Sequence, residues 1–314
     1  MSSYLPSTKQ IYYNMYGESN KRSFVLGEEW IYYKLYTGVK TADKILENAI
    51  KPATEYLTKK KYIDKWFFIR YSDPELHLRV RLHCTSTESL ALIISTFYKY
   101  IQDFIASEAI WKLQTDTYQR ELERYGDQTI QYSEDLFFLE SQLIVNLLSF
   151  LDTSNGETKR WLIALKLIDS FLDSFKCKLT DKLRILENLR ESFRKELGIS
   201  KSICGNKFLK DRLVIEKCLN PYLEQDSQIK EFLTQLELHK KSIIPVADNI
   251  IVNFINNRPK ISFDNLLGSF LHMSMNRLFR SKQRIHEMVI YDYLFRYYQS
   301  LIFRLKLSSK ETKI

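Results

Sequence analysis

The sequence predicts an α+β protein, with a ferredoxin-like βαββαβ sheet layer in residues 1–127 and a predominantly helical part over residues 128–314. Two observations predict this fold. Before residue 127, segments with strand and helix periodicity follow one another in the order β-α-β-β-α-β, which is the ferredoxin-like arrangement. After Ser133 only the helical spacing of apolar residues appears. No Pro- or Gly-rich linker separates the two parts, so we expect one compact functional unit.

The four predicted strands are short runs rich in β-branched and aromatic residues, each bounded by turn residues. The first run, WIYYKLYT, ends at Gly38, and the second, KWFFIRY, is closed by Ser72-Asp73-Pro74, which is typical of a turn. The third run alternates cleanly between apolar and polar residues. The strands are expected over 30–37, 65–71, 75–84 and 110–120.

Helical spacing predicts two helices between these strands and seven in the second half. Thr180 and Ser262 are expected N-caps. Pro245 should kink or split its helix because proline lacks the amide hydrogen. Turns are expected at Asn155-Gly156 and at 198–200. The helices are expected over 42–57, 86–104, 134–152, 157–176, 181–197, 209–220, 226–256, 263–280 and 284–306.

The composition excludes several classes of protein. With 45% hydrophobic and 27% charged residues, the chain is a folded globular protein. Only eight glycines occur, none spaced for a dinucleotide fingerprint or a phosphate loop. The four cysteines lie far apart without a CxxC pair, so no zinc ribbon or redox motif is expected. Neither a signal peptide nor a membrane span is predicted, and the expected location is the cytoplasm.

A row of cationic side chains lies in the third predicted strand, HLRVRLH. Because side chains alternate along a strand, the three apolar residues should face the core and the four others should share the opposite face. Like charges in one row repel one another. The row is therefore either a solvated face with carboxylates opposite, or an anion site, since guanidinium groups offer carboxylates a planar fork of donors. The residues of this row are His77, Arg79, Arg81 and His83.

A second charged segment, YQRELERYG, follows the fourth predicted strand and includes Arg120, Glu121 and Arg124. In a ferredoxin-like sheet the fourth strand lies close to the first, which neighbours the third. Either arginine is therefore placed to reach the face that carries the cationic row. The alternative is a surface cluster of ion pairs, which contributes little free energy.

A third feature is the helical segment LHMSMNRLF, in which His272 and Asn276 are one turn apart on the same face. One interpretation is a buried histidine whose hydrogen bonds are satisfied. The other is proton transfer, because histidine is the side chain that changes charge near neutral pH.

The runs GEEWIYYKLYTG, KWFFIRYSDPELHLRVRLH, YQRELERYG and LHMSMNRLF, in this order and spacing, resemble the C-terminal elimination domain of lanthipeptide dehydratases. The same domain occurs as a free-standing protein in lanthipeptide and thiopeptide biosynthesis. The resemblance runs from Gly27 to the C-terminus. It implies a lyase that expels glutamate from glutamylated serine or threonine of a precursor peptide, which leaves dehydroalanine or dehydrobutyrine. It also implies that no metal or organic cofactor is needed and that a separate glutamyl-tRNA-dependent protein glutamylates the peptide, and it leaves a homodimer open.

The resemblance also implies roles for individual residues. The paired arginines of the family match Arg79 and Arg81, and the histidine before the N-R pair matches His272. The glutamate and arginine before R-Y-G match Glu121 and Arg124. The predicted catalytic residues are Arg81, Arg124 and His272. The predicted substrate-binding residues are Arg79, Arg120, Glu121, Asn276 and His77.

We expect Arg79, Arg81, Arg124 and His272 to line one pocket. His272 is expected to be the base rather than the acid, because a carboxylate leaves readily whereas the Cα proton is weakly acidic. Two alternatives remain. One is a cycloaddition enzyme similar to thiopeptide pyridine synthases, which need not keep these residues. The other is a non-catalytic module that binds peptide or tRNA, since a net charge of +9 favours polyanions.

Overall fold

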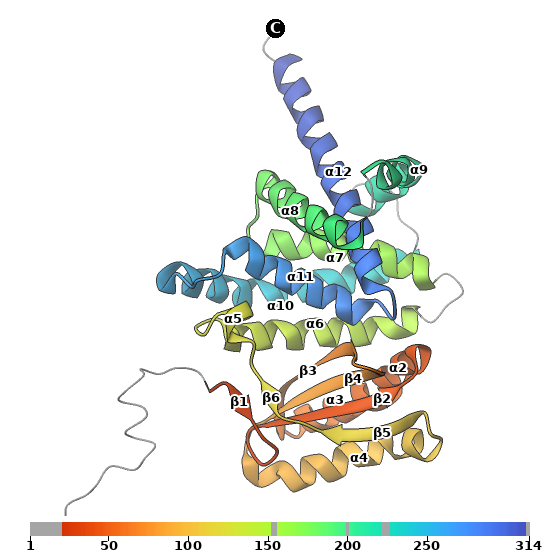
Figure 1. Cartoon of the computed structure of the whole chain (residues 1–314), viewed down its shortest axis with the longest axis vertical. Coiled ribbons are helices and arrows are strands. Elements are labelled where there is room, and N and C mark those ends of the chain that lie inside the picture. The colour runs from red at the N-terminus through yellow and green to blue at the C-terminus, as the bar shows by residue number, and fades with distance from the viewer. Residues whose placement is uncertain (1–20, 152–155, 199–200, 221–226, 312–314) are drawn as a thin grey trace, which may run out of the picture.

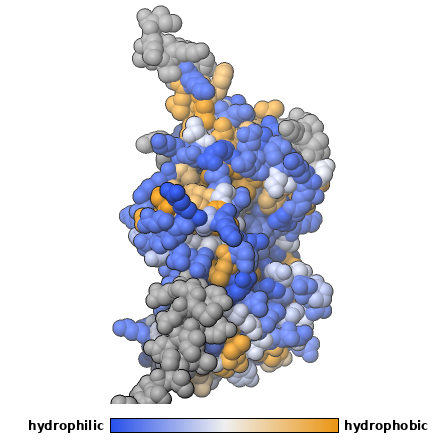
Figure 2. Space-filling model, turned by 60° about the vertical axis from the view of Figure 1, so that its left-hand side comes forward, coloured by the Kyte–Doolittle hydropathy of each residue, from blue (hydrophilic) through white to orange (hydrophobic). Residues whose placement is uncertain are grey.

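The computed structural model describes residues 21–151, 156–198, 201–220 and 227–311. Figure 1 shows a sheet layer with helices on one side and a larger helical part on the other. Helix α6 (Ile130–Leu151) lies directly against the sheet layer, and further helices pack on it. On the face shown in Figure 2, hydrophilic residues predominate and hydrophobic side chains form separate patches.

The sheet layer is the predicted ferredoxin-like sheet. Four antiparallel strands lie in the order β3-β4-β2-β5, so the two central strands are the first and third of the βαββαβ unit. Strand β3 forms one edge and β5 the other. The bounds of the strands are Trp30–Thr37 (β2), Ile63–Ser72 (β3), Leu76–Cys84 (β4) and Ile110–Thr115 (β5).

The predicted fourth strand, over 110–120, is wrong at its C-terminal end. Strand β5 stops at Thr115, and β6 (Tyr118–Gln119) pairs instead with β1 (Ser23–Phe24) in a separate two-stranded sheet. The chain turns away at Asp116, whose carboxylate accepts the amide hydrogen of Thr117 at 2.7 Å. This is typical of aspartate in turns. The charged segment after Gln119 therefore leaves the plane of the main sheet.

One face of the sheet is covered by helical segments, and the apolar residues of the central strands point to them. The ring of Tyr33 stacks on Phe97 of this layer with centroids 4.6 Å apart. Leu78, Val80 and Leu82 are fully buried, which confirms that the apolar half of β4 faces the core. The covering segments are α2 (Val39–Ile45), a π-helical stretch η1 (Leu46–Ile50), α3 (Lys51–Lys59), a short 3₁₀ turn η2 (Thr87–Ser89) and α4 (Leu90–Ala106).

The seven helices predicted for the second half are present, preceded by a single-turn helix. Ser262 is confirmed as an N-cap, because its hydroxyl accepts the amide hydrogen of Asn265 at 3.2 Å. Thr180 is not a cap, since the helix already begins after Lys178. Beside α6, the helices are α5 (Leu122–Tyr125), α7 (Gly156–Ser174), α8 (Leu179–Leu197), α9 (Lys201–Leu219), α10 (Ser227–Asn257), α11 (Phe263–Leu278) and α12 (Gln283–Glu311).

Pro245 lies inside α10 and does not split it. Of the expected turns, Gly156 instead begins α7. Gly198 does end α8 in the left-handed conformation, with φ 64°. Asn155 and residues 199–200 lie outside the described residues. No helix in the described part of the chain is both long and apolar enough to cross a membrane.

Helix α11 docks on the free edge of the sheet through side chains that satisfy the backbone of β3. The Asn276 amide accepts from the Arg70 N–H at 2.9 Å and donates to the Arg70 carbonyl at 2.8 Å. The Nε of Arg277 donates to the carbonyl of Phe68 at 3.0 Å. An edge strand presents unpaired backbone groups. These three bonds therefore fix α11, and every residue on it, relative to the sheet.

A buried aspartate joins the two parts of the fold at another point. Asp43 of α2 accepts from Arg70 of β3 at 2.5 Å and from Arg160 of α7, and Arg280 lies 3.8 Å away. Replacement of Asp43 by Asn should lower the free energy of unfolding by about 3–5 kcal/mol, because it leaves buried arginines without their countercharge. Urea denaturation followed by circular dichroism measures this loss.

The matched control is Asp64→Asn. Asp64 also pairs with a cationic residue, His83, at 2.6 Å, but its side chain is half exposed. We expect a loss of less than about 1 kcal/mol there, as for other exposed pairs. Equal losses for the two variants would show that the Asp43 cluster does not hold the two parts together.

Candidate functional site

The cationic row of β4 lies on the sheet face opposite the covering helices, as the alternation predicts. Its central member, Arg81, stands between Tyr32 of β2 and Phe67 of β3. The guanidinium lies 4.4 Å from the centre of the Tyr32 ring and 4.9 Å from that of Tyr118. Arg81 is only 8% exposed, and no carboxylate among the described residues forms an ion pair with it. Arg81 is thus a buried cation held by aromatic faces, which attract cations.

The neighbours of Arg81 in the row have local partners. The Arg79 guanidinium stacks 3.4 Å from the centre of the Tyr71 ring and donates to Nε2 of His77 at 3.1 Å. Nδ1 of His77 lies 2.9 Å from the Glu75 carbonyl. Burial, more than the nearby Arg79 charge, lowers the pKa of His77. A neutral His77 with its proton on Nδ1 satisfies both contacts, so this imidazole is a fixed acceptor for Arg79.

Arg120 is engaged in a buried ion pair. Its Nε and Nη2 each donate to the carboxylate of Glu134 at 2.7 Å, and its Nη1 donates to the Lys21 carbonyl at 3.1 Å. Each guanidinium nitrogen therefore has a protein partner. These contacts tie the segment after β6 to α6, and the role of Arg120 in substrate binding stays a prediction.

Arg124 and Glu121 lie together at the surface, one turn apart on α5. Their side chains are 46% and 60% exposed and form an ion pair at 3.2 Å. The chain then reverses at Gly126, whose φ is 76°. A Cβ at this position would lie 2.8 Å from the hydroxyl oxygen of Thr129. Glycine therefore permits the turn that places Arg124 between the sheet and helix α11.

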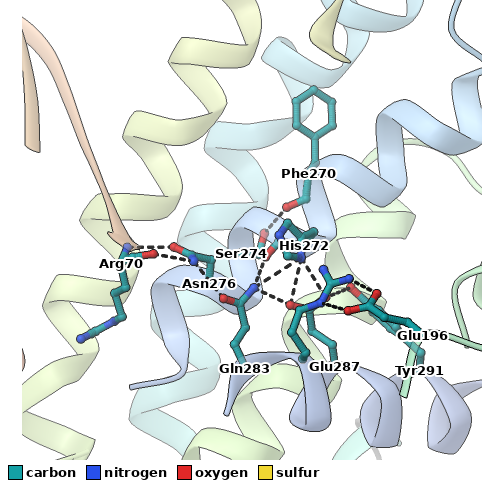
Figure 3. Close-up of polar contacts among 10 residues, drawn as sticks. Arg70, Glu196, Phe270, His272, Ser274, Asn276, Gln283, Glu287 and Tyr291 are labelled. Carbon is teal, nitrogen blue, oxygen red and sulfur yellow. Dashed lines mark hydrogen bonds and ion pairs between the residues drawn. The ribbon is translucent and has the colours of Figure 1, made fainter. Parts of the chain in front are cut away.

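His272 of α11 faces a buried carboxylate of α12. Its Nδ1 lies 3.0 Å from both oxygens of Glu287, which is 0% exposed (Figure 3). Tyr291 donates to the same carboxylate at 3.4 Å, and burial, followed by the Glu287 charge, raises the pKa of this tyrosine well above its ordinary value. Because an ionised carboxylate only accepts hydrogen bonds, Nδ1 carries the proton. Nε2 of His272 is then the unprotonated nitrogen, and the side chain is 27% exposed.

Gln283 and Asn276 support this pair. Gln283 donates to the His272 carbonyl at 3.2 Å and also contacts Glu287 (Figure 3). Asn276 donates to the side-chain oxygen of Gln283 at 2.8 Å, in addition to its bonds with Arg70. The amide of Asn276 is thus engaged in positioning α11 and Gln283, and its role in substrate binding stays a prediction.

Sequence reasoning missed Glu287, Gln283 and Tyr291. Their only signal is spacing, because positions four apart share one face of α12. That spacing says nothing about the partner of this face. Only the packing of α12 against α11 shows that the partner is His272.

Two cavities adjoin these residues. The larger, of about 350 Å³, lies between α8 and α11 and contains both Arg124 and His272 in its lining. The smaller, of about 40 Å³, is lined by Arg81, Glu121 and Arg277 among aromatic and aliphatic side chains. The expectation of one pocket is therefore wrong in part. Arg124 and His272 share a cavity, Arg81 lies in the neighbouring one, and Arg79 lines neither.

The two linings are connected at two points. Arg124 of the larger cavity pairs with Glu121 of the smaller one. His272 lines the larger cavity, and the next residue, Met273, lines the smaller. The further residues of the larger lining are Ile185, Asn188, Leu189, Ser192, Phe193, Asp264, Asn265, Gly268, Ser269 and Arg284.

The His, Cys, Asp and Glu side chains of the described residues form no cluster of three that could hold a metal ion. Cys84, Cys177 and Cys218 are free thiols. Burial raises the pKa of Cys84 and of Cys218 to about 12 and that of Cys177 to about 11. These thiols therefore stay protonated and are poor nucleophiles.

The chain is thus an α+β protein in which a histidine–carboxylate pair borders a polar cavity and a buried arginine lies next to it. Residues 30–298 match the family model described as the C-terminal domain of lantibiotic biosynthesis dehydratases. Because this match spans most of the chain, the protein belongs to that family.

Curated relatives of the chain are much longer proteins. The nisin biosynthesis protein NisB of Lactococcus lactis subsp. lactis is 23% identical over 267 residues, which cover 81% of this chain and 26% of NisB. The subtilin biosynthesis protein SpaB of Bacillus subtilis is 22% identical over 282 residues, which cover 87% of this chain and 26% of SpaB. The chain therefore spans about a quarter of the length of these relatives.

Solved structures share the fold. The tRNA-dependent lantibiotic dehydratase MibB from Microbispora sp. 107891 superposes with a TM-score of 0.73 at 20% identity, over 90% of this chain and 29% of MibB. The pyridine synthase TbtD from thiomuracin biosynthesis superposes with a TM-score of 0.61 at 11% identity, over 87% of this chain and 99% of TbtD. At these identities the likeness concerns the fold alone.

Proposed function

We propose that the chain is an eliminase that expels glutamate from glutamyl-serine or glutamyl-threonine in a precursor peptide and forms dehydroalanine or dehydrobutyrine. The observation that carries the proposal is the pair of His272 and buried Glu287, which leaves Nε2 of His272 for the cavity that Arg124 also lines. Membership in the dehydratase family supports the same reaction class.

The proposed step needs a base. Nε2 of His272 takes the Cα proton of the esterified residue, and the electrons of that C–H bond form the Cα=Cβ double bond. The Cβ–O bond breaks, and glutamate leaves as a carboxylate with the bonding electron pair. The imidazolium that forms lies 3.0 Å from the Glu287 carboxylate, which stabilises it without a change of position.

The step also needs positive charge near the substrate. As the Cα proton leaves, negative charge develops on the adjacent peptide carbonyl, and this charge then departs on the ester carboxylate of glutamate. Arg124 is placed for this task because it lines the same cavity as His272 and its side chain is 46% exposed. Preorganised cations of this kind lower the barrier, since they need not reorganise during the reaction.

The substrate must arrive glutamylated, so the proposal includes a partner. About three quarters of the length of each relative lies outside the part that this protein matches. We propose that a separate protein transfers glutamate from glutamyl-tRNA to the precursor peptide, and that this chain acts second. The larger cavity offers neutral polar side chains of α8 and α11, such as Asn188 and Ser269, to the peptide backbone.

Mass spectrometry of a peptide with glutamyl esters on serine or threonine tests the function. We expect the purified protein to convert it, with loss of one glutamic acid per site and without added ATP or tRNA. The control variant His83→Ala should convert it equally, because His83 pairs with Asp64 and lines neither cavity. A peptide that stays glutamylated in the presence of the folded protein would exclude the proposal.

One observation favours a second candidate. The chain matches nearly the whole length of the pyridine synthase TbtD, whereas it matches only part of MibB. A cycloaddition enzyme would act on a peptide that already contains dehydroalanine. The same assay distinguishes the two, because such an enzyme would leave the glutamylated peptide intact and would cyclise a peptide with two dehydroalanines.

A further inference from the structure

The two edges of the main sheet differ in how the rest of the chain covers them. The β3 edge is covered, because Asn276 and Arg277 of α11 bind its backbone groups. Strand β5 forms the other edge, and no strand of the described residues pairs with its outer side (Figure 1). This strand contains no proline, and its one charged side chain, Lys112, lies over the ring of Tyr36. An open edge of this kind is a template for another strand.

The outward-facing backbone groups of β5 belong to Leu113 and Thr115. The N–H of Asp116 donates to the Tyr32 carbonyl of β2 at 3.1 Å. Hydrogen-bonded and non-hydrogen-bonded pairs alternate along antiparallel strands. Gln114, two residues before Asp116, therefore directs its backbone groups to β2, whereas its two neighbours direct theirs away from β2. The outer edge of β5 thus presents two amides and two carbonyls, placed symmetrically about Gln114.

This edge is complementary to itself. If a second copy of β5 runs antiparallel with Gln114 opposite Gln114, Leu113 of each copy lies opposite Thr115 of the other. All four outward groups of each strand then form hydrogen bonds across a two-fold axis. The register shift between β5 and β2 falls before Lys112, so this pairing uses only the regular part of the strand.

Charge favours the same register. It places Lys112 of each copy opposite Asp116 of the other, and opposite charges in cross-strand pairs are stabilising. Asp116 already pairs with Lys34 of its own chain, but its side chain is 44% exposed and has room for a second lysine. A register centred on Lys112 would instead bring two like charges together, which is destabilising.

Apolar side chains lie beside this edge. A groove of about 530 Å³ between α4 and β5 is lined by aliphatic and aromatic side chains and one serine, and Ile94, Tyr98 and Leu113 belong to its lining. Ile94 and Leu113 are each 37% exposed, and Tyr98 is 52% exposed. Exposed apolar patches mark interaction sites. The pairing brings Leu113 of one copy beside the groove of the other, so these side chains become buried when the strands join.

We propose that two copies of this chain associate through their β5 strands, in the register centred on Gln114, and that their four-stranded sheets join into one continuous sheet. Helices α6 and α11 pack against β3 at the opposite edge, so the helical part leaves β5 open to a second copy (Figure 1). No residue of β5 lines either cavity of the candidate site. The inference is therefore independent of the proposed function.

Sedimentation velocity of the full chain at increasing concentration tests the association. We expect a concentration-dependent dimer in the wild type. Gln114→Lys places two lysines opposite each other in the dimer and should raise its dissociation constant about tenfold or more. Gln114 is exposed in the single copy, so the variant should fold as the wild type does. The matched control is Gln299→Lys, the same change at an exposed position of α12, which should leave the dimer unchanged.

Cysteine cross-linking tests the register. Gln114 lies opposite itself in a non-hydrogen-bonded pair, whose Cα atoms are about 4.5 Å apart. A disulfide can bridge this distance. Mild oxidation should therefore turn Gln114→Cys into a covalent dimer, seen on a non-reducing gel. The wild type controls for the native cysteines, and Gln299→Cys controls for random collisions.

Three results would overturn the inference. One is a wild type that stays monomeric. Another is a dimer that Gln114→Lys does not weaken and Gln114→Cys does not cross-link, because its interface would then lie elsewhere. The third comes from hydrogen exchange, in which the amides of Leu113 and Thr115 should gain protection as the concentration rises. Protection that is already complete at high dilution would mean that a segment of the same chain, and not a second copy, covers the edge.

Discussion

Replacement of His272 by Ala should lower the turnover of a glutamylated peptide by about 10²–10⁴-fold, the range that general base catalysis contributes. The reason is geometric. Nδ1 of His272 is held by Glu287, so that Nε2 remains for a substrate in the cavity shared with Arg124. No other histidine lines that cavity. Because the base acts on the Cα proton, kcat should fall far more than KM rises. Single-turnover mass spectrometry measures both.

The pH dependence of turnover by the wild type shows whether His272 acts as the base or as the acid. A base must be unprotonated and an acid protonated, so the direction in which the rate changes with pH separates the two roles. We expect turnover to rise with pH in the wild type and to lose this rise in His272→Ala. A rate that falls as pH rises, in the wild type alone, would instead make His272 the acid. Added imidazole should restore part of the lost turnover.

The fold could be predicted where local patterns decide it. Strand β2 matches its predicted bounds, because aromatic residues favour strands and Gly38 marks the end of the run. The helices of the second half were predicted from the helical spacing of their apolar residues, which is also a local pattern. The end of β5 depends on tertiary contacts instead, because Tyr118 leaves the sheet to pair with β1 and to donate to Glu134. Nothing within residues 110–120 reveals those partners.

The candidate site divides in the same way. Strand alternation placed Arg81 on the face opposite the core, and the structure agrees. The sequence predicts Arg120 as a substrate-binding residue or as a member of a surface cluster of ion pairs, yet it is buried against Glu134 of α6. Arg277 of α11 and Glu287 of α12 are fully buried, which no local pattern in the sequence indicates. Whether a charged residue is buried depends on the residues that pair with it, and these lie far away in the sequence.

Replacement of Glu287 by Gln should lower turnover by about 10²–10³-fold, as does the loss of a group that stabilises charge in the transition state. The change keeps the size of the side chain and lets its amide oxygen accept from Tyr291 and His272. It removes the negative charge 3.0 Å from the imidazole, in a site that is 0% exposed. The matched control is Glu157→Gln, because Glu157 is an exposed partner of Arg280 and neither residue lines the two cavities.

The separate effects on kcat and KM show how Glu287 acts. The imidazole gains its positive charge only when it takes the proton, and the Glu287 carboxylate lies 3.0 Å from it. The loss in Glu287→Gln should therefore fall on kcat, whereas KM should stay close to that of the wild type. If kcat is unchanged and the variant only unfolds at a lower urea concentration, Glu287 only holds α11 and α12 together.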